Sequence, residues 1–449
     1  MKIKQVAIFF LVVLIVVATI LGGEIFPKYA VRFVFFGALL LIDLACWKIF
    51  RKYNEEKKFW FRGMLNIAYW LPVLAFIAFL IISYFFPIQT WMPVLRIYVP
   101  GVLIVLFIWK FILLISFLIG ELIAIPVNFY RNRKAEIDDE EYPKPWRSQF
   151  FITAGLITAT SFSLLLFSGF YFWVYDFKVQ RLTIEVEDLP TGLSGVKIVQ
   201  LSDIHLGSWI SKKPLERAVD SVNSLHPDII VFTGDMVNFV TSEAFPFKET
   251  LEKLKAPLGI YAVLGNHDYG DYVQWDSYED HKKNNLDLQE LYKQMGWKLL
   301  KNSNVLIHMG GDSLALIGVE NWSSKKIWGQ KGDLKKALAG VSAVQVKVLL
   351  SHDPTHWDNE VIRKYPDILL TLSGHTHAMQ MGLELRNFRW SPAKWVFDRW
   401  AGLYTLENQG KNQYLNVNRG LGHLGIPARI GIRPEITLIT LKKAKPDSN

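Results

Sequence analysis

Five short stretches of the chain place histidine, aspartate or asparagine directly after an apolar run of the kind that forms buried strands. The run 229–232, for example, leads through Gly234, which permits a sharp turn, to Asp235. The other four stretches read SDIHLG, GNHD, SHDP and SGHTH. One such motif is weak evidence. Five in sequence, most with a glycine turn, indicate a single site assembled from several strand ends.

The candidate side chains of this site are imidazoles, carboxylates and one amide, without a thiolate. Asp203 and His205 are two residues apart, so in extended backbone they point to the same side, as a chelating pair must. Asp235 is the carboxylate that we place between two ions. Such a donor set favours Mn²⁺, Fe or Zn²⁺ over a soft metal. The candidates are Asp203, His205, Asp235, Asn266, His267, His352, His375 and His377.

The elements that must position these residues alternate between strand and helix, as in a layered α/β domain. Strands are expected at 181–187, 196–201, 229–232, 258–264, 314–319, 344–350, 368–372, 414–417 and 435–441. Helices are expected at 214–225, 249–255 and 284–295. We expect the last two strands to lie at sheet edges.

The first 175 residues hold most of the apolar excess of a chain that is 51% hydrophobic. Five apolar runs there are long enough to cross a membrane, at 5–23, 30–50, 64–86, 98–127 and 150–174. We therefore expect a transmembrane domain of about five helices over residues 1–175. A catalytic domain is expected over residues 176–449.

Basic residues cluster between the second and third spans and between the fourth and fifth, whereas the other short loops carry few. The positive-inside rule then places the N-terminus and both basic loops in the cytoplasm of a cell (inner) membrane protein. With five spans, the catalytic domain is extracytoplasmic. Residues 1–180 hold 18 Lys and Arg against 11 Asp and Glu, and the remainder holds 32 against 30. The net charge of +9 therefore reflects topology and attraction to the lipid bilayer, and no stable nucleic-acid binding is expected.

The only cysteine, Cys46, lies in the second expected span, which excludes a disulfide framework and a zinc–thiolate site. Three ionisable residues, Asp43, Lys110 and Glu121, also fall within expected spans. Two interpretations stay open. They form a polar path or lipid-binding pocket between helices, or Asp43 and Glu121 snorkel toward span ends while Lys110 pairs inside the bundle.

The motif order D-x-H, GD, GNHD, SHDP, GHTH resembles that of the calcineurin-like metallophosphoesterase superfamily, over roughly residues 181–441. The lead-in LSGVKIVQLSDIHLG and the tail RGLGHLGIPARIGIRPEITLITL are similar to its bacterial membrane-associated branch, which includes diacylglucosamine-pyrophosphatase-like enzymes. The resemblance implies a four-layer αββα sandwich with a dinuclear metal site at the strand ends.

The resemblance also implies roles for individual residues. One ion would be held by Asp203, His205, Asp235 and His377, and the other by Asp235, Asn266, His352 and His375. His267 would be the catalytic histidine. In the protein-phosphatase branch an Asp-Arg-Gly follows the GD motif, whereas Met236-Val237-Asn238 follow it here. This departure argues against phosphoprotein substrates.

Two bound ions would lower the pKa of a bridging water, and His267 would protonate the leaving oxygen. Trp209, Asp268 and His423 are candidate substrate contacts. The segment 386–404 interleaves basic and aromatic residues. Five of its residues recur at the spacing of one face of a helix, namely Trp390, Lys394, Phe397, Ala401 and Tyr404. It is either an interfacial segment that admits a lipid head group or an aromatic flap packed on the domain.

The leading function is a membrane-anchored dinuclear-metal phosphoesterase that hydrolyses a lipid-linked or envelope-derived phosphoester. A cyclic-nucleotide phosphodiesterase or nuclease could use the same metal site. A third alternative is a non-catalytic membrane sensor or scaffold that binds a phosphoryl ligand, which the complete set of candidate ligands disfavours.

Overall fold

The structure is a computed structural model that describes residues 57–141, 143, 149–385 and 388–444, with scattered positions from 13 to 54. The expected spans 5–23 and 30–50 therefore lie largely outside the described residues. The chain divides into two compact units. The first comprises Met1–Pro87 and Val102–Leu164, and the second comprises Ile88–Gly101 and Leu165–Asn449.

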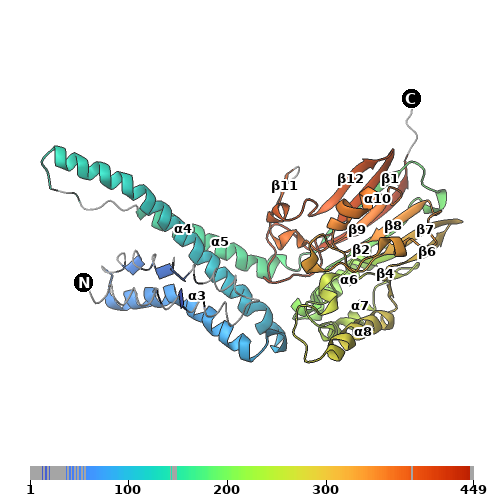
Figure 1. Ribbon diagram of the computed structural model, residues 1–449, viewed down its shortest axis with the longest axis horizontal. Helices are drawn as coiled ribbons and strands as arrows, with labels where there is room; N and C mark the ends of the chain where they lie inside the picture. Colours follow the sequence, from blue (N-terminus) through green and yellow to red (C-terminus); the bar gives the residue numbers. More distant parts are fainter. Residues whose placement is uncertain are drawn as a thin grey trace. The chain divides into compact units, whose positions relative to one another are not determined.

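Three long apolar helices carry the described part of the membrane region (Figure 1). They are α3 (Phe59–Phe85), α4 (Pro93–Ile137) and α5 (Gln149–Ser168), which continues into the π-helical turn η3 (Gly169–Trp173). Within the described residues, these three are long and apolar enough to cross a membrane, and they coincide with the last three expected spans. Because α4 has 45 residues, it extends beyond the expected 98–127 at both ends. The total of five spans remains a prediction.

Lys110 and Asp43 form a buried ion pair within the first unit. The Lys110 ammonium lies 2.7 Å from the Asp43 carboxylate and 4.2 Å from the centre of the Tyr69 ring. A buried ion without such a partner would be costly in an apolar bundle. The interpretation in which Lys110 pairs inside the bundle is therefore correct for Lys110. The same interpretation expected Asp43 to snorkel toward the end of its span, which is wrong, because Asp43 is the buried partner of Lys110. Glu121 is exposed.

The second unit contains two six-stranded sheets, each mixed in strand direction. The first has the order β1-β14-β2-β3-β4-β5 and the second β12-β13-β9-β8-β7-β6. The first comprises β1 (Lys178–Val186), β14 (Glu435–Lys443), β2 (Lys197–Leu201), β3 (Ile229–Phe232), β4 (Ile260–Ala262) and β5 (Lys298–Leu299). The second comprises β12 (Gly402–Asn408), β13 (Lys411–Val417), β9 (Leu370–Ser373), β8 (Val346–Leu350), β7 (Asp312–Gly318) and β6 (Ser303–Met309). A separate hairpin pairs β10 (Leu383–Leu385) with β11 (Phe388–Trp390).

Alternating side chains place the two sheets face to face, with helices on the outside (Figure 1). In β2, Ile198 joins the core between the sheets, whereas Val199 and Leu201 join the core beneath the outer helices. The helices α6 (Lys212–Asn223), α7 (Lys248–Leu251) and α8 (Tyr278–Gln294) cover the first sheet. The short helices α9 (Leu334–Ala337) and α10 (Ile362–Lys364), with the π-helical turn η10 (Trp357–Val361), cover the second. The expected αββα sandwich is confirmed.

Two expectations about the tail of the domain are wrong. The strands at 414–417 and 435–441 are interior, because β13 lies between β12 and β9, and β14 lies between β1 and β2. Side chains on both faces of β14 are buried, which its sequence pattern does not reveal. The described residues 388–404 form no α-helix, because a short 3₁₀ turn, η12 (Pro392–Trp395), follows β11 and the chain then enters β12. Burial of Phe397, Trp400 and Ala401 in one small core overrides the helical spacing.

Candidate metal centre

Five strand ends bring the candidate residues together. Strands β2, β3 and β4 are parallel neighbours in one sheet, and β8 and β9 are parallel neighbours in the other. The carboxyl ends of parallel neighbours lie at the same edge, so their following loops converge. Gly234 makes one of these turns with a φ of 98°, and a Cβ there would lie 2.5 Å from the amide nitrogen of Gly265. The expected glycine turn is therefore required at this position.

One cluster of potential ligands consists of Asp203, His205 and His377, whose donor atoms lie within 4.8 Å of one another. The two Nε2 atoms of His205 and His377 are 3.0 Å apart. Nε2 of His377 is 3.3 Å from Oδ1 of Asp203. All three residues are buried.

A second cluster consists of Asp235, His352 and His375. Nε2 of His352 lies 3.2 Å from Oδ2 of Asp235, 3.3 Å from Nδ1 of His375 and 3.2 Å from Oδ1 of Asn266. The same Asp235 oxygen is 3.6 Å from Nε2 of His205 in the first cluster. Asp235 therefore lies between the clusters, where a shared ligand would be required.

The backbone fixes which ring nitrogens face these clusters. Nδ1 of His205 lies 3.2 Å from the Val237 carbonyl oxygen, and Nδ1 of His352 lies 2.7 Å from that of Thr233. Since a carbonyl can only accept, each Nδ1 carries the proton, and Nε2 can present a lone pair to the cluster. Such anchoring of one ring nitrogen by a carbonyl is typical of metal-ligating histidines.

Electrostatics also fit a cation at this centre. Burial lowers the pKa of His205 to about 3 and that of His377 well below its usual value, so both imidazoles are neutral. Their two Nε2 atoms lie 3.0 Å apart, close enough for both to bind the same cation. Burial opposes the charged form of His352 as well, but the Asp235 carboxylate outweighs it and raises the pKa of His352 to about 10. A divalent ion would displace that proton and balance the carboxylate instead.

Five of the candidate ligands adopt left-handed backbone conformations, with φ between 47° and 70°. They are Asp203, His205, Asp235, His375 and His377. Such a conformation costs about 1–3 kcal/mol for a non-glycine residue and persists only where surrounding contacts enforce it. Backbone hydrogen bonds between the loops supply those contacts, including Asp203 N–H to Gly234 O at 2.8 Å and His205 N–H to Asp235 O at 3.1 Å. Strain concentrated at one edge of the sandwich is typical of a functional site.

His267 lies at the rim of the first cluster and belongs to neither ligand group. Its backbone N–H donates to Oδ1 of Asp235 at 2.9 Å, and its Nδ1–H donates to the Asn238 carbonyl at 2.7 Å. Its ring centre is 5.0 Å from that of His205 and 4.3 Å from that of Tyr272, on which it stacks. The catalytic role of His267 remains a prediction, and the contact with Asn238 fixes Nδ1 as the nitrogen that donates to the backbone.

Tyr272 also orients Asn266, a role that no sequence motif indicates. Its hydroxyl accepts a hydrogen bond from Nδ2 of Asn266 at 2.7 Å. Because the amide nitrogen is held there, the amide oxygen is the atom that faces His352 and the second cluster.

A buried ion pair supports the loop that holds His267. Oε2 of Glu243 accepts the backbone N–H groups of Asn238 and Phe239 at 2.7 and 3.1 Å. Nη1 of Arg96 lies 3.0 Å from the other Glu243 oxygen, and its Nη2 donates to the Gly207 carbonyl at 2.8 Å. Arg96 belongs to the first turn of α4, within the second unit. The sequence shows it only as a lone basic residue in an apolar region.

The three predicted substrate contacts have roles within the domain. The Asp268 carboxylate accepts the backbone N–H groups of Asp235, Met236, Val237 and Gly265 and so shapes the turn that carries Asp235. The Trp209 indole donates to the Ile204 carbonyl at 2.6 Å, and its side chain is buried. His423 is also buried, with its ring 6.3 Å from that of Tyr175. Substrate contact by these residues remains a prediction.

Buried Arg429 is the one described arginine whose guanidinium lies against a candidate ligand, 3.5 Å from Nδ1 of His377. Its side chain is fully buried and donates to the carbonyls of Arg419, Gly420 and Gly422. Burial lowers its pKa to about 9. It therefore fixes the tail loop beside His377.

An αββα sandwich with two buried imidazole–carboxylate clusters at its strand ends defines a metal-dependent hydrolase of phosphoesters. Residues 196–379 match the family described as Calcineurin-like phosphoesterase. The chain is 32% identical over 386 residues to a "Transmembrane protein with metallophosphoesterase domain" of Danio rerio, covering 83% of this chain and 80% of that protein. It belongs to the calcineurin-like phosphoesterases, as its motifs predict.

Two bacterial relatives match about three fifths of the chain. An "Uncharacterized metallophosphoesterase" of Aquifex aeolicus is 31% identical over 269 residues, which covers 60% of this chain and 93% of the relative. The "UDP-2,3-diacylglucosamine pyrophosphatase LpxG" of Chlamydia trachomatis is 28% identical over 323 residues, covering 61% and 93%.

Removal of a candidate ligand should lower the metal content of the purified protein. We expect Asp235→Ala and His377→Ala to lose bound metal and turnover together, because each removes a donor atom from a buried cluster. Elemental analysis by inductively coupled plasma mass spectrometry measures the metal per chain. His308→Ala, which changes an exposed histidine on β6, is the control and should retain the wild-type content.

Loss of the Arg96–Glu243 pair should impair His267 without removing the ions. The double variant Arg96→Met, Glu243→Gln leaves no unpaired buried charge. We expect its turnover of alkyl phosphoesters to fall by about tenfold to a hundredfold, since displacement of a catalytic group by about 1 Å has an effect of that order. The partly exposed pair Arg433–Asp176 provides the matched control, as Arg433→Met, Asp176→Asn. Loss of metal in the Arg96 variant would contradict this assignment.

Proposed function

We propose that the chain is a membrane-anchored phosphoesterase that binds two divalent ions and hydrolyses a lipid-linked or envelope-derived phosphoester. The observation that carries this proposal is the position of Asp235 between two ligand clusters, with His267 beside them and outside both. The proposed ligands are Asp203, His205, Asp235 and His377 for one ion and Asp235, Asn266, His352 and His375 for the other. Mn²⁺, Fe and Zn²⁺ all suit this donor set.

The chemistry divides between the ions and the protein. Bound divalent ions would lower the pKa of water and neutralise the oxygens of the phosphoryl group. The backbone carbonyls of Thr233 and Val237 accept the Nδ1–H groups of His352 and His205 and so orient Nε2 of each ring toward the ions. His267, with its Nδ1–H donated to Asn238, is oriented to protonate the leaving oxygen through Nε2.

Four observations support a lipid-linked or envelope substrate over a phosphoprotein or a nucleic acid. The chain carries helices long and apolar enough to span a membrane, and a relative is named as a UDP-2,3-diacylglucosamine pyrophosphatase. Met236-Val237-Asn238 replace the Asp-Arg-Gly of protein phosphatases. Residues 181–449 are nearly neutral, so a long polyanion would gain little electrostatic attraction.

We also propose that the catalytic unit is extracytoplasmic in the cell (inner) membrane. The support is the distribution of Lys and Arg among the loops together with five spans. A reporter enzyme fused to the C-terminus distinguishes the two sides, and activity of a reporter that functions only in the cytoplasm would contradict this orientation.

The substrate class is tested by assaying the purified full-length protein with Mn²⁺ on phospholipids, nucleotide-linked lipids and cyclic nucleotides. Preferential hydrolysis of the lipid-linked compounds supports the proposal. Preference for cyclic nucleotides or oligonucleotides would favour the alternative phosphodiesterase or nuclease. Binding of phosphoryl compounds with no hydrolysis of any compound would favour a sensor.

Substitution of His267 should separate general-acid catalysis from metal binding. We expect His267→Ala to retain wild-type metal content but to lose about a hundredfold or more of its turnover on alkyl phosphoesters. Its turnover of p-nitrophenyl esters should fall much less, because that leaving group needs no proton. Equal losses on both substrates would rule out the general-acid role.

A further inference from the structure

The β10–β11 hairpin has one apolar face and one polar face. Its register pairs Leu383 with Trp390, Glu384 with Arg389 and Leu385 with Phe388. Paired residues of an antiparallel ladder point to the same side and successive residues to opposite sides. Leu383, Leu385, Phe388 and Trp390 therefore share one face, and Glu384 and Arg389 share the other.

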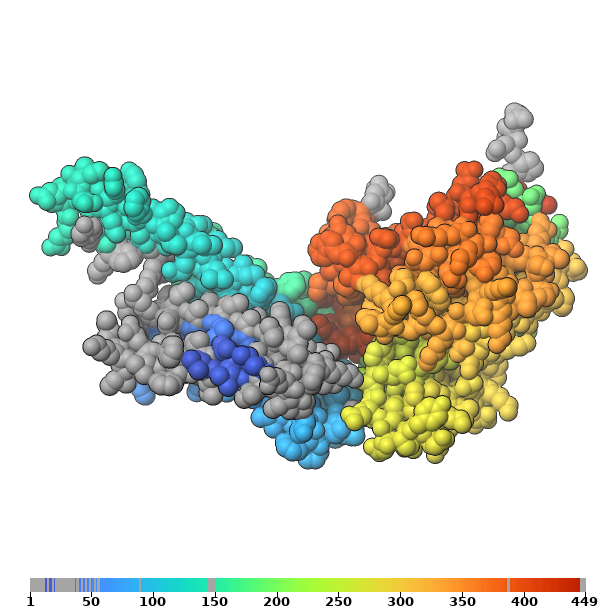
Figure 2. Space-filling model, viewed as in Figure 1, coloured from blue at the N-terminus to red at the C-terminus, as the bar shows by residue number. Residues whose placement is uncertain are grey.

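The apolar face is uncovered in the second unit. Leu383, Leu385 and Phe388 are 46%, 61% and 54% exposed, and the neighbouring Trp395 is 71% exposed. The rings of Trp390 and Trp395 meet edge to face at 5.7 Å, so Trp395 extends the same surface. In the space-filling view the orange-red segment that contains these residues projects from the surface of its unit (Figure 2). We call Leu383, Leu385, Phe388, Trp390 and Trp395 the apolar hairpin face.

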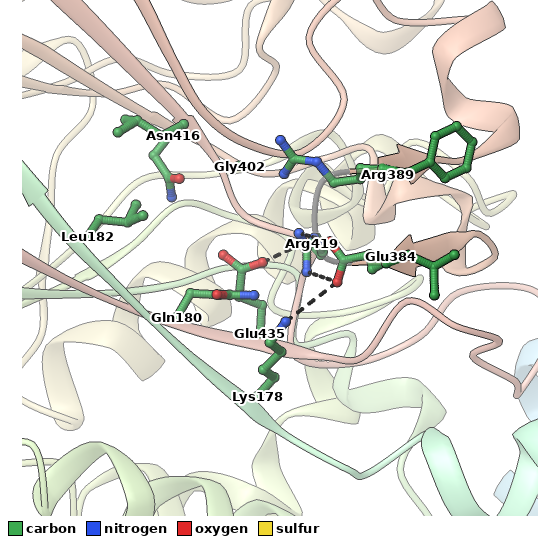
Figure 3. A pocket seen from close by; sticks show the side chains of 12 residues that line it. Lys178, Gln180, Leu182, Glu384, Arg389, Gly402, Asn416, Arg419 and Glu435 are labelled. Atoms are coloured by element: carbon green, nitrogen blue, oxygen red, sulfur yellow. Dashed lines mark hydrogen bonds and ion pairs between the residues drawn. The ribbon is translucent and has the colours of Figure 1, made fainter.

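The polar face anchors the hairpin to the sandwich (Figure 3). Glu384 accepts two hydrogen bonds from the buried Arg419 guanidinium, and Arg419 also lies 3.3 Å from Glu435 of β14. Lys178 of β1 reaches Glu384 at 3.6 Å. These residues and Arg389 line an open cavity of about 560 Å³, whose edge is formed by Leu385 and Phe388. The buried charges thus hold the polar face against the sandwich, while the apolar residues stay largely exposed at the edge of the cavity.

The base of the hairpin forms backbone hydrogen bonds with the segment around Ile430, which also contacts the end of α5. The Gly382 N–H donates to the Ile430 carbonyl and the Ile430 N–H to the Gln380 carbonyl, both at 2.8 Å. The same segment approaches Gly169 at the end of α5 so closely that a Cβ there would lie 2.7 Å from the Arg429 carbonyl oxygen. These contacts all lie within the second unit.

The end of the last span marks the level of the bilayer surface beside this base. Tyr171 and Phe172, in η3 directly after α5, are 79% and 66% exposed. Aromatic residues in this position are typical of the interface between lipid and water. Lys394, exposed beside Trp395, adds the cationic character that favours anionic head groups.

We propose that the apolar hairpin face inserts into the surface of the same bilayer that the chain spans, and so docks the catalytic unit on lipid. This surface is separate from the metal centre, and the inference holds whether or not the substrate is a lipid. Its consequence for the site is direct, because the hairpin follows the metal-ligand candidate His377 after the turn η11 (His377–Gln380). Ser391, directly after β11, donates to the Ala378 carbonyl at 2.6 Å and ties the far end of the hairpin to the same turn.

Fluorescence quenching in the full-length protein tests the docking directly. Cys46 is the only cysteine, so a Cys46→Ser background allows one label at a time. An environment-sensitive dye is attached to Leu385→Cys after reconstitution into vesicles of phosphatidylethanolamine and phosphatidylglycerol. We expect emission from this dye to shift to the blue and to lose most of its intensity when the vesicles contain lipids brominated in the upper acyl chain.

The matched control is Leu286→Cys on α8, which replaces a leucine of similar exposure, 54%, on a different element. Its dye should show neither the shift nor the quenching. An unquenched, water-exposed dye at position 385 would overturn the proposal. A blue-shifted dye that brominated lipid does not quench would also overturn it, since a second protein copy would then cover the face. Neither result depends on substrate hydrolysis, so failure here leaves the proposed function untouched.

Discussion

Crowding of candidate ligand atoms at the strand ends is the constraint on which the rest of this protein depends. The Nε2 atoms of His205 and His377 lie 3.0 Å apart, with the carboxylates of Asp203 and Asp235 next to them. Buried polar groups of this kind are stable only where partners hold them. The fold therefore has to fix the orientation of each side chain before any ion arrives, and most features of the site serve that end.

The backbone of the converging loops provides this restraint. Carbonyl oxygens of Thr233 and Val237 take the ring N–H groups of two histidines, and the Asp268 carboxylate gathers the amides of the turn that carries Asp235. Left-handed conformations at five candidate ligands show that the loops are held away from their local preference. The free energy that offsets this backbone strain comes from the two sheets, whose apolar faces bury a continuous core between them.

The compact unit that holds the catalytic site also includes the ends of two long apolar helices. Residues 88–101, at the start of α4, belong to the same compact unit as the sandwich. From there Arg96 reaches Glu243 and thereby the loop that holds His267. Near Gly169, the segment around Arg429 supports both the base of the β10–β11 hairpin and His377. The ends of the long apolar helices and the catalytic edge of the sandwich thus share a set of contacts within one compact unit.

The sequence by itself determined the family, the layered α/β fold and the strand ends on which Asp203, Asp235 and His352 lie, because these features depend on local order along the chain. Apolar runs, glycine turns and the spacing of polar residues are all local signals. Tertiary structure alone decided that β14 is interior, that Tyr272 orients Asn266, and that Arg96 supports His267 from more than a hundred residues away. The first and third are contacts between distant parts of the chain, and the second depends on how the loop after Asn266 folds back, so none of them follows from a local sequence pattern. The same reason explains the segment after Phe388, where burial of Trp400 in a distant core prevailed over the helical spacing written in the sequence.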